Sequence, residues 1–248
     1  MFSPRVALAS LSGRSDAGWA LAVGEYVGCA FLGGIALDRG TRAAARELTE
    51  RDREEFLPRD PIAFVEEQFA ALSGTEIRPG FNVRASDPEP IREVATVCAD
   101  HGAICEINAH CRQAEMCDAG AGESLLRDGN RLTEQVETAS ETGAAVSVKV
   151  RAEVSAVDLA DLARRIERAG ADAIHVDAMD SEYVIRDVSR ACDLFVIANN
   201  GVRDRETTEE YLAFGADAVS VGRASDDPRV LTAVRETTDR WFEREVTA

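Results

Sequence analysis

The sequence predicts a (β/α)8 barrel (the TIM barrel), in which eight parallel strands alternate with helices around a closed sheet. Three observations favour this fold. Short apolar runs alternate with longer amphipathic stretches along the chain, which indicates parallel strands joined by right-handed crossovers. The 248 residues fit one barrel domain spanning residues 1–248. The glycine-rich turn that a doubly wound sheet carries after its first strand is absent.

Eight apolar segments are the expected strands. They cover residues 6–10, 28–33, 76–83, 103–108, 145–150, 171–176, 194–199 and 218–222. The expected helices cover residues 61–73, 88–101, 131–142, 157–169, 181–191, 206–214 and 226–245. Three helices end at a glycine directly before the next strand, which is typical of a short helix-to-strand connection. These glycines are Gly143, Gly170 and Gly215.

One segment does not fit this alternation. Residues 34–59 are long and charged, and we expect an extra loop and a short helix over the barrel mouth. The sequence leaves open whether this segment is a lid or an interface, and it does not determine whether the protein is a homo-oligomer.

The charge of the chain is strongly acidic. The net charge is -17 and the pI is about 4.6, and Lys149 is the single lysine beside many arginines. An acidic surface with almost no lysine suits a halophilic protein, because concentrated salt screens the self-repulsion. The alternative is an ordinary acidic protein with an arginine bias. In either case, binding a nucleic acid would require a local basic patch.

Composition also excludes several classes of protein. No apolar run is long enough to cross a membrane, and the first ten residues lack the pattern of a signal peptide. We therefore expect a cytoplasmic protein without a membrane partner. The six cysteines are irregularly spaced and form no zinc-ligand pair, so neither a disulfide framework nor a metal site is indicated.

Polar residues collect where the expected strands end. In a barrel of this type the carboxyl ends of the strands surround the active site. From the third strand to the eighth, these polar ends are Asn82 and Arg84; Asn108, His110 and Cys111; Lys149 and Arg151; His175 and Asp177; Asn199, Asn200 and Gly201; and Gly222 and Arg223.

Lys149 is the leading functional candidate. An ammonium acts as a compact charge partner, a hydrogen-bond donor or a Schiff-base nucleophile in ways that a guanidinium does not. All other lysine or arginine positions of the chain are arginine. The retention of a lysine at a strand end therefore indicates function. Retention by chance is the alternative.

The last two strand ends predict a phosphate site. Asn200 and Gly201 follow the seventh strand, and Gly222 and Arg223 follow the eighth. Barrels commonly hold a ligand phosphate between these two loops. The alternative is that the glycines serve tight turns only.

Two further residues are weaker candidates by themselves. Cys111 lies in a polar loop at the expected barrel mouth, where a reactive thiol is plausible. His175 is one of three histidines and lies at a strand end, where it could equally be a structural residue.

Taken together, these residues resemble the dihydrouridine synthase family. Its loop runs Ile-Asn-x-Gly-Cys-Pro and then, after a spacer, Gly-Ser-x-Leu-Leu. The matching stretch here runs from Ile107-Asn108-Ala109-His110-Cys111 to Gly122-Glu123-Ser124-Leu125-Leu126. Upstream, Asn82-Val83-Arg84-Ala85-Ser86-Asp87-Pro88 is similar to Gln-Leu-x-Gly-Ser-Asp-Pro, and downstream Val148-Lys149-Val150-Arg151 is similar to Val-Lys-Ile-Arg. The resemblance covers residues 81–228.

The resemblance implies an FMN cofactor, with NADPH or NADH as the electron donor. It implies that Asn82 and Lys149 contact the flavin ring and that His175 approaches it. The implied phosphate ligands are Asn200, Gly201, Gly222 and Arg223. Cys111 would be the acid that protonates a uracil-type ring, either an RNA uridine or a free pyrimidine, and Asn108 would help to orient that ring.

The chain departs from the family pattern at three places. His110 and Arg112 flank Cys111 where the pattern has glycine and proline, and His175 is followed by Val176-Asp177 in place of Gly-Arg. The tRNA-modifying members also carry a helical domain after the barrel. We expect a short archaeal-type member without that domain, which weakens the case for tRNA as the substrate.

Other functions stay open at this point. The second is a small-molecule oxidoreductase of the dihydroorotate or dihydropyrimidine dehydrogenase kind, which shares FMN and the barrel. The third is a flavin-free, phosphate-binding isomerase or lyase that uses Lys149 as its active amine. The fourth is a degenerate barrel that only binds a ligand.

Overall fold

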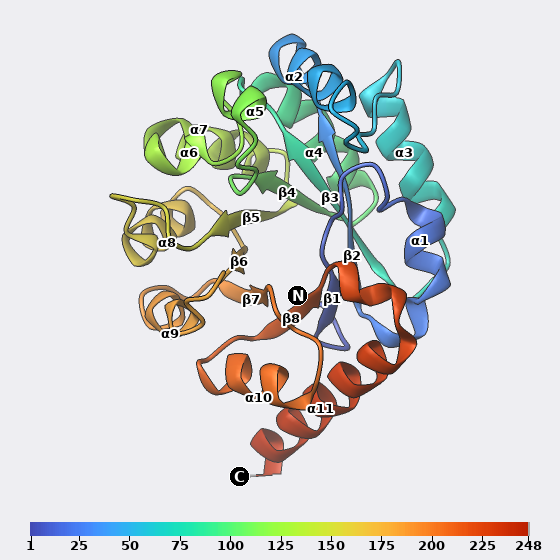
Figure 1. Cartoon of the computed structure of the whole chain (residues 1–248), viewed down its shortest axis with the longest axis vertical. Helices are drawn as coiled ribbons and strands as arrows, with labels where there is room; N and C mark the ends of the chain where they lie inside the picture. The colour runs from blue at the N-terminus through green and yellow to red at the C-terminus, as the bar shows by residue number, and fades with distance from the viewer. Residues whose placement is uncertain (248) are drawn as a thin grey trace.

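The computed structural model describes the backbone of residues 1–247 and the side chains of residues 1–244. Its eight strands form a closed parallel barrel in chain order, with β8 pairing with β1 (Figure 1). The predicted TIM barrel is therefore confirmed. The strands are β1 (Val6–Leu8), β2 (Cys29–Ala36), β3 (Arg78–Arg84), β4 (Ile104–Asn108), β5 (Ala145–Arg151), β6 (Ala173–Asp177), β7 (Phe195–Asn199) and β8 (Ala218–Val221).

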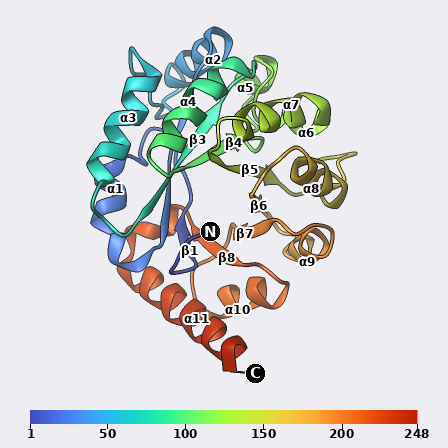
Figure 2. The same ribbon diagram turned by 180° about the vertical axis from the view of Figure 1, so that it is seen from behind.

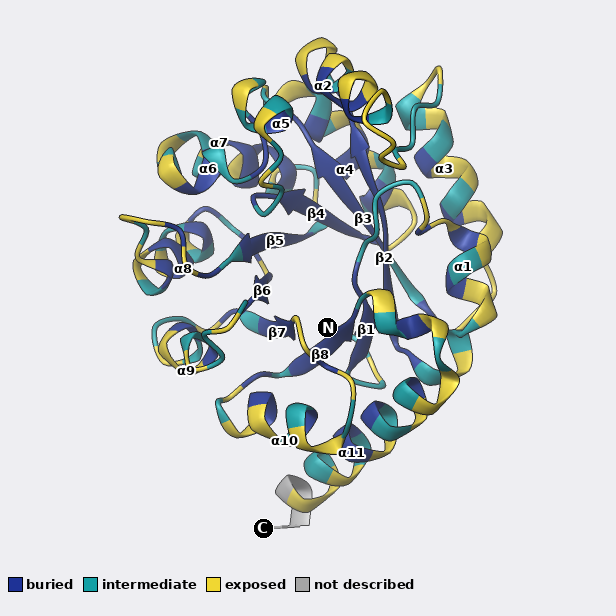
Figure 3. Cartoon of the chain, in the orientation of Figure 1, coloured by how far each residue is buried: buried dark blue, intermediate teal, exposed yellow. Residues whose placement is uncertain are grey.

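The helices form an outer ring around the barrel, as both views show (Figures 1 and 2). They are α1 (Ala17–Ala22), η1 (Gly24–Tyr26), α2 (Arg39–Thr49), α3 (Pro61–Leu72), α4 (Glu89–Asp100), α5 (Ala114–Asp118), α6 (Ser124–Arg127), α7 (Gly129–Ser140), α8 (Leu159–Arg168), α9 (Val184–Ser189), α10 (Arg205–Ala213), η2 (Arg223–Asp226) and α11 (Pro228–Thr247). Figure 3 shows the strands buried and the outward helix faces exposed, as the amphipathic pattern requires.

Glycine ends the helices where the sequence predicted it. Gly143, Gly170 and Gly215 have φ values of 82°, 99° and 95°, in the left-handed region that favours glycine. Each follows a helix and leads the chain into the next strand. The short connections that close the barrel are therefore fixed locally.

The barrel interior changes from apolar to polar along the strands. Successive inward residues on β4 are Ile104, Glu106 and Asn108, and on β5 they are Ala145, Ser147 and Lys149, in register with one another. Below them, an apolar cluster fills the amino end of the barrel. It comprises Ala7, Cys29, Phe31, Ile104, Ile197 and Ala218. The polar layers above this cluster lie at the carboxyl ends of the strands.

The segment 34–59 combines a strand end, a helix and a loop. β2 continues three residues beyond the predicted end at Gly33, because a bulge between Gly33 and Ile35 keeps the strand paired with β3. The buried face of α2, including Ala44 and Leu48, then packs with Met116 of α5. The predicted extra helix is therefore present, and the loop after it reaches the barrel mouth.

A buried ion pair anchors that loop. The side chains of Arg84 and Glu55 are each 1% exposed and bonded to each other, and Arg84 Nη2 also donates to the Gly34 carbonyl at 2.5 Å. Burial disfavours the charged guanidinium, but the hydrogen bond and charge of Glu55 outweigh this and raise the pKa of Arg84. The loop is thus tied to the end of β3 and forms a fixed wall of the mouth.

Among the described residues, no helix is both long and apolar enough to cross a membrane.

Candidate active site at the carboxyl ends of the strands

A cavity of about 960 Å³ opens at the carboxyl ends of the strands. Its volume lies within the range of cofactor and small-molecule sites. Loops after β1, β4, β6, β7 and β8 contribute to its wall, and Asp52, Arg53 and Glu54 of the 34–59 segment complete it. The cavity therefore lies where the strand-end residues predicted an active site.

Eight of the nine predicted site residues line this cavity. They are Asn82, Asn108, Cys111, Lys149, Asn200, Gly201, Gly222 and Arg223. His175 is the exception, because its side chain is fully buried one layer below the wall. The contacts of these residues with a flavin or a substrate stay predictions.

The side chains below the cavity form one continuous hydrogen-bonded chain. Glu106 lies at its centre with a fully buried side chain. Asn82 Nδ2 donates to Glu106 Oε1 at 2.7 Å, and Asn108 Nδ2 donates to Asn82 Oδ1 at 2.8 Å. On the other side, His175 Nδ1 lies 2.7 Å from Glu106 Oε2.

The same chain reaches β7 and β8. His175 Nε2 lies 2.7 Å from Ser220 Oγ, and Asn199 Nδ2 donates to that hydroxyl at 2.8 Å. Burial lowers the pKa of His175, with the charge of Glu106 opposing and that of Lys149 assisting. Glu106 stays ionised: burial alone would raise its pKa, but His175, Lys149 and Asn82 together lower it. The network thus joins an imidazole with a lowered pKa to a carboxyl group with a lowered pKa beneath the cavity floor.

Asn108 connects this network to the loop that carries Cys111. Its Oδ1 accepts the backbone N–H groups of His110 at 3.1 Å and of Cys111 at 2.8 Å. The Cys111 carbonyl in turn accepts the N–H of Glu123 at 2.8 Å. Gly122 has a φ of 62°, and a Cβ there would lie 2.3 Å from the Cys111 carbonyl oxygen, so glycine is required at this position. The loop holds the half-buried thiol at the cavity wall.

Lys149 lies at the cavity floor, within the electrostatic influence of two carboxylates. Its side chain is only about 3% exposed. Burial lowers the pKa of its ammonium, while the negative charges of Glu106 and Asp177 act against that effect. The single lysine is therefore a nearly desolvated amine that faces a ligand cavity, which fits the functional role predicted for it.

The residues predicted to bind a phosphate lie on two loops of the cavity wall. Asn200 and Gly201 both have positive φ, at 85° and 70°, and the Tyr211 hydroxyl donates to the Asn200 carbonyl at 2.8 Å. Arg223 begins the η2 turn after Gly222, and its exposed guanidinium has no ion-pair partner among the described residues. The loops present backbone N–H groups and a free cation at one side of the cavity.

Four residues of the site were given no functional role by the sequence analysis. Glu106 and Ser220 interrupt apolar strands, which is the signal that could have identified them. His110 and Asp177 line the cavity and contact each other at 2.7 Å. The sequence shows both as departures from a family pattern but gives no indication that they meet. Among the described residues, no group of three or more metal-ligating side chains is placed to hold a metal ion.

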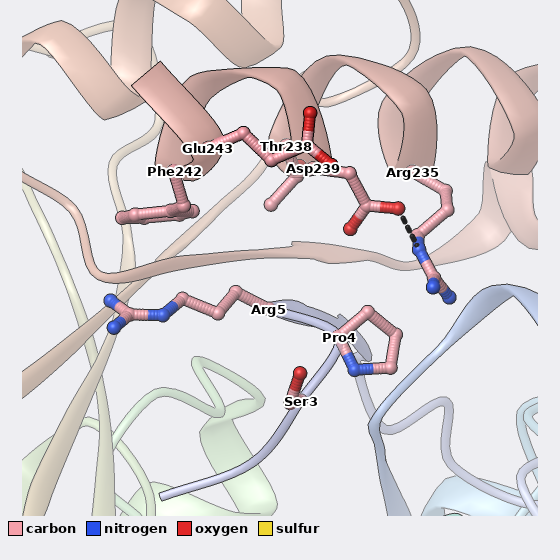
Figure 4. Close-up of a pocket in the computed structure, with 8 residues that line it drawn as sticks. All are labelled: Ser3, Pro4, Arg5, Arg235, Thr238, Asp239, Phe242 and Glu243. Atoms are coloured by element: carbon pink, nitrogen blue, oxygen red, sulfur yellow. Dashed lines mark hydrogen bonds and ion pairs between the residues drawn. The ribbon is translucent and has the colours of Figure 1, made fainter. Parts of the chain in front are cut away.

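A second hollow, of about 600 Å³, lies at the opposite end of the barrel (Figure 4). It separates residues 3–5, which precede β1, from the last helix α11. Arg5 lies over the Phe242 ring at 4.1 Å and 3.6 Å from Asp217, and Arg235 pairs with Asp239 at 2.5 Å. Most of its charged groups are thus already paired with neighbours, whereas the first cavity also has on its wall the guanidinium of Arg223, unpaired within the described part of the chain.

The closed parallel barrel, with a buried amine and a half-buried thiol facing one cavity at its carboxyl ends, defines a TIM-barrel protein with an enzyme-like site. The family model for dihydrouridine synthase (Dus) matches residues 64–247. The chain belongs to the dihydrouridine synthase family, as the resemblance predicted. Membership in this family supports an oxidoreductase.

The curated proteins similar to this chain include a named dihydrouridine synthase, at low identity. An uncharacterized protein of Methanocaldococcus jannaschii is 27% identical over 88% of both chains. The tRNA-dihydrouridine synthase B of Xanthomonas axonopodis is 28% identical, over 58% of this chain and 47% of that protein. The catalytic subunit of dihydroorotate dehydrogenase B of Methanothermobacter thermautotrophicus is 25% identical, over 62% and 60% of the two chains. The chain therefore aligns with only about half the length of the named synthase.

Solved structures share the fold. FabK of Thermotoga maritima (M276A mutant) superposes with a TM-score of 0.60 at 19% identity, over 90% of this chain and 63% of that chain. The tryptophan synthase complex of Pyrococcus furiosus superposes with a TM-score of 0.59 at 15% identity, over 96% and 97%. At such identities these matches establish the barrel alone.

Proposed function

We propose that the protein is an FMN-dependent oxidoreductase that acts on the C5–C6 bond of a uracil-type ring, with NADPH or NADH as the electron donor. The observation that carries the proposal is the position of Cys111, Asn108 and Lys149 at one cavity that also includes the Gly201 and Gly222–Arg223 loops. A thiol, a buried amine and an anion-binding pair of loops are the groups that this chemistry needs in one place.

The residues present fit FMN. Its phosphate would lie against the loops of Asn200–Gly201 and Gly222–Arg223, where an unpaired guanidinium and backbone N–H groups are available. Its ring would lie against Asn82 and Lys149 on the cavity floor. The cavity volume of about 960 Å³ admits a flavin together with a second small ring. When bound, reduced FMN supplies the hydride for the reaction.

The protein side chains would handle charge and protons. Lys149 places a positive charge beside the ring-binding floor, which favours an anionic ligand ring there. Asn108 fixes the loop backbone by accepting the N–H groups of His110 and Cys111, which positions the thiol at the cavity as the proton donor to a ring carbon. His175 and Glu106 would support Asn82 from below, as a layer of positioning residues.

A second candidate function is the oxidation or reduction of a small anionic pyrimidine, as in the dihydroorotate dehydrogenases. Two exposed arginines at the cavity, Arg53 and Arg112, favour it, because neither has an ion-pair partner within 4 Å among the described residues. They leave positive charge on the cavity wall of a protein whose net charge is -17. A carboxylate or phosphate on the substrate would complement them.

The first test is the visible absorption spectrum of the protein purified in high salt, with any released cofactor identified by mass. We expect bound FMN, or uptake of added FMN. Arg223→Gln should weaken FMN binding by about tenfold or more, the effect of a lost charge-assisted hydrogen bond. Arg229→Gln is the matched control, since the Arg229 side chain is 90% exposed and bonded to Asp227. A colourless protein that takes up no FMN would overturn the proposal in favour of a flavin-free barrel.

The second test separates the substrates. Reduced FMN-loaded protein is mixed without oxygen with uracil, with uracil 6-carboxylate or with an unmodified tRNA transcript, and flavin reoxidation is followed. Reoxidation by tRNA alone would favour the synthase activity, and reoxidation by the carboxylate alone would favour the second candidate. Cys111→Ala should bind FMN normally but lose the reaction.

A further inference from the structure

Two departures of this chain from the dihydrouridine synthase pattern lie against each other. His110 occupies the position of a glycine in that pattern, and Asp177 occupies the position of an arginine. The two residues are 67 positions apart in the sequence, yet His110 Nε2 lies 2.7 Å from Asp177 Oδ2. Because the contact needs both residues, the two departures form a single feature of this site.

Neighbouring groups hold both partners at the cavity wall. The His110 backbone N–H donates to Asn108 Oδ1 at 3.1 Å. The second carboxylate oxygen of Asp177, Oδ1, accepts the backbone N–H of Met179 at 3.2 Å. Both side chains line the cavity, and they are 32% and 12% exposed. The orientation of the imidazole ring is therefore set from β4 and from β6.

The charge state of the pair follows from its surroundings. Burial disfavours ionisation of Asp177, but His110, the Met179 N–H and Lys149 outweigh it and bring the pKa of Asp177 to about 2. Burial lowers the pKa of His110; Asp177 opposes that effect, and the charges of Lys149 and Arg151 add to it. The directions of these two shifts favour a carboxylate beside a neutral imidazole.

This charge state fixes the tautomer. An ionised carboxylate only accepts hydrogen bonds, so the imidazole proton must lie on Nε2. Nδ1 then keeps its lone pair and has no hydrogen-bond partner among the described residues. A glycine at this position would provide no acceptor of this kind.

We propose that His110, oriented by Asp177, is a specificity-determining hydrogen-bond acceptor of the cavity, and that its Nδ1 receives a ring N–H of the bound substrate. The choice of a uracil-type ring rests on the proposed function; the orientation of the imidazole does not. A uracil ring presents one N–H donor between its two carbonyl groups, and the free base a second next to C6, so an acceptor fixed beside Cys111 would select rings that carry an N–H.

The orientation is tested without any ligand by ¹⁵N NMR of the imidazoles at neutral pH. His101→Gln and His175→Gln assign the signals, since the chain has three histidines. We expect the Nε2–H tautomer for His110. In Asp177→Asn the amide oxygen remains on the Met179 N–H and the NH2 group faces the ring, so the His110 proton should move to Nδ1. A protonated ring or an Nδ1–H tautomer in the wild type, or no change in the variant, would overturn the proposal.

The ligand role is tested by binding of uracil, 1-methyluracil and 3-methyluracil to the FMN-loaded protein. His110→Leu keeps the bulk but lacks both nitrogens, and should weaken uracil binding by about three- to tenfold, the loss of one hydrogen bond. His110→Gln should restore binding, because its amide can donate to Asp177 and accept from the ring. The methylated ring that lacks the N–H received by His110 should bind to the wild type and to His110→Leu with equal affinity.

Equal losses in the Leu and Gln variants, or no loss in either, would overturn the ligand role, with thermal unfolding showing whether each variant is folded. Failure to bind FMN would contradict the proposed function, whereas the NMR result would still decide the orientation of His110. Binding of FMN without binding of any uracil ring would overturn both the substrate assignment and the acceptor role.

Discussion

The two ends of the barrel use their inward residues in opposite ways. At the amino end, Phe31, Ile104 and Ile197 pack into an apolar cluster, and the hollow outside it is lined by side chains that largely pair with one another. At the carboxyl end, the ionisable side chains of Glu106 and Lys149 are buried beneath an open cavity. The amino end stabilises the fold, whereas the carboxyl end keeps desolvated charges that a stable core would avoid.

The largest effect is expected at the carboxyl end, from Arg84→Leu. This change leaves the Glu55 carboxylate buried without its partner, and should lower the free energy of unfolding by about 3–5 kcal/mol. Urea unfolding in high salt measures it. The double variant Arg84→Leu, Glu55→Leu should recover much of the loss, because the unpaired charge is gone. A double variant as unstable as the single one would show that the pair holds the loop by its hydrogen bonds to the backbone.

At the amino end, Ile104→Ala should lower the free energy of unfolding by about 2–4 kcal/mol, since it leaves a cavity in the apolar cluster. The comparison of the two ends predicts that FMN affinity, measured by titration of the folded variant, stays unchanged. A parallel loss of FMN affinity would mean that the two ends are not independent.

Acidification should weaken the carboxyl end specifically. The pKa values of His110 and His175 are lowered in the folded protein. As the pH falls, these two histidines therefore take up protons more readily in the unfolded chain than in the folded one. Stability should therefore be complete above about pH 6.5 and decline as the pH falls below it, by at most about 1.4 kcal/mol per pH unit for each histidine. The slope is obtained from the free energy of unfolding, measured in high salt at about pH 7.5 and about pH 5.5, roughly one unit either side of the ordinary histidine pKa. His175→Gln should reduce it, and an unchanged slope would contradict the assignment.

The smallest effect is expected from Arg5→Gln at the amino-end hollow. The ion pair with Asp217 is 40% exposed on both sides and the Phe242 contact is at the surface. The change should alter the free energy of unfolding by at most about 1 kcal/mol. A larger loss would indicate that this hollow contributes to the fold as much as the apolar cluster does.

The sequence predicted the barrel well because its signals are local. Apolar runs, helix periodicity and the terminal glycines each depend on neighbours in the chain, and the strands lie within a few residues of their predicted ranges. The predicted end of β2 was wrong because Gly33 and Gly34 resemble a strand terminus, whereas a bulge carries the strand on. The short helices α1, α5 and α6 are too brief to give a periodic pattern.

The site was predicted only where residues stand at strand ends. Lys149 and Cys111 were found in this way, and both line the cavity. Glu106 and Ser220 lie deeper, and their function depends on which strand face is inward, which a mainly apolar strand does not reveal. The contact between His110 and Asp177 joins two loops that only the closed barrel brings together.

The single lysine has a consequence for chemical labelling. Apart from the α-amino group of Met1, Lys149 carries the one primary amine of the chain, and it lies on the floor of the cavity. An amine-directed reagent can therefore modify a side chain only by entering the site, and a ligand that fills the cavity should block the modification. Selective isotopic labelling of lysine would likewise place one probe, free of background, at the centre of the site.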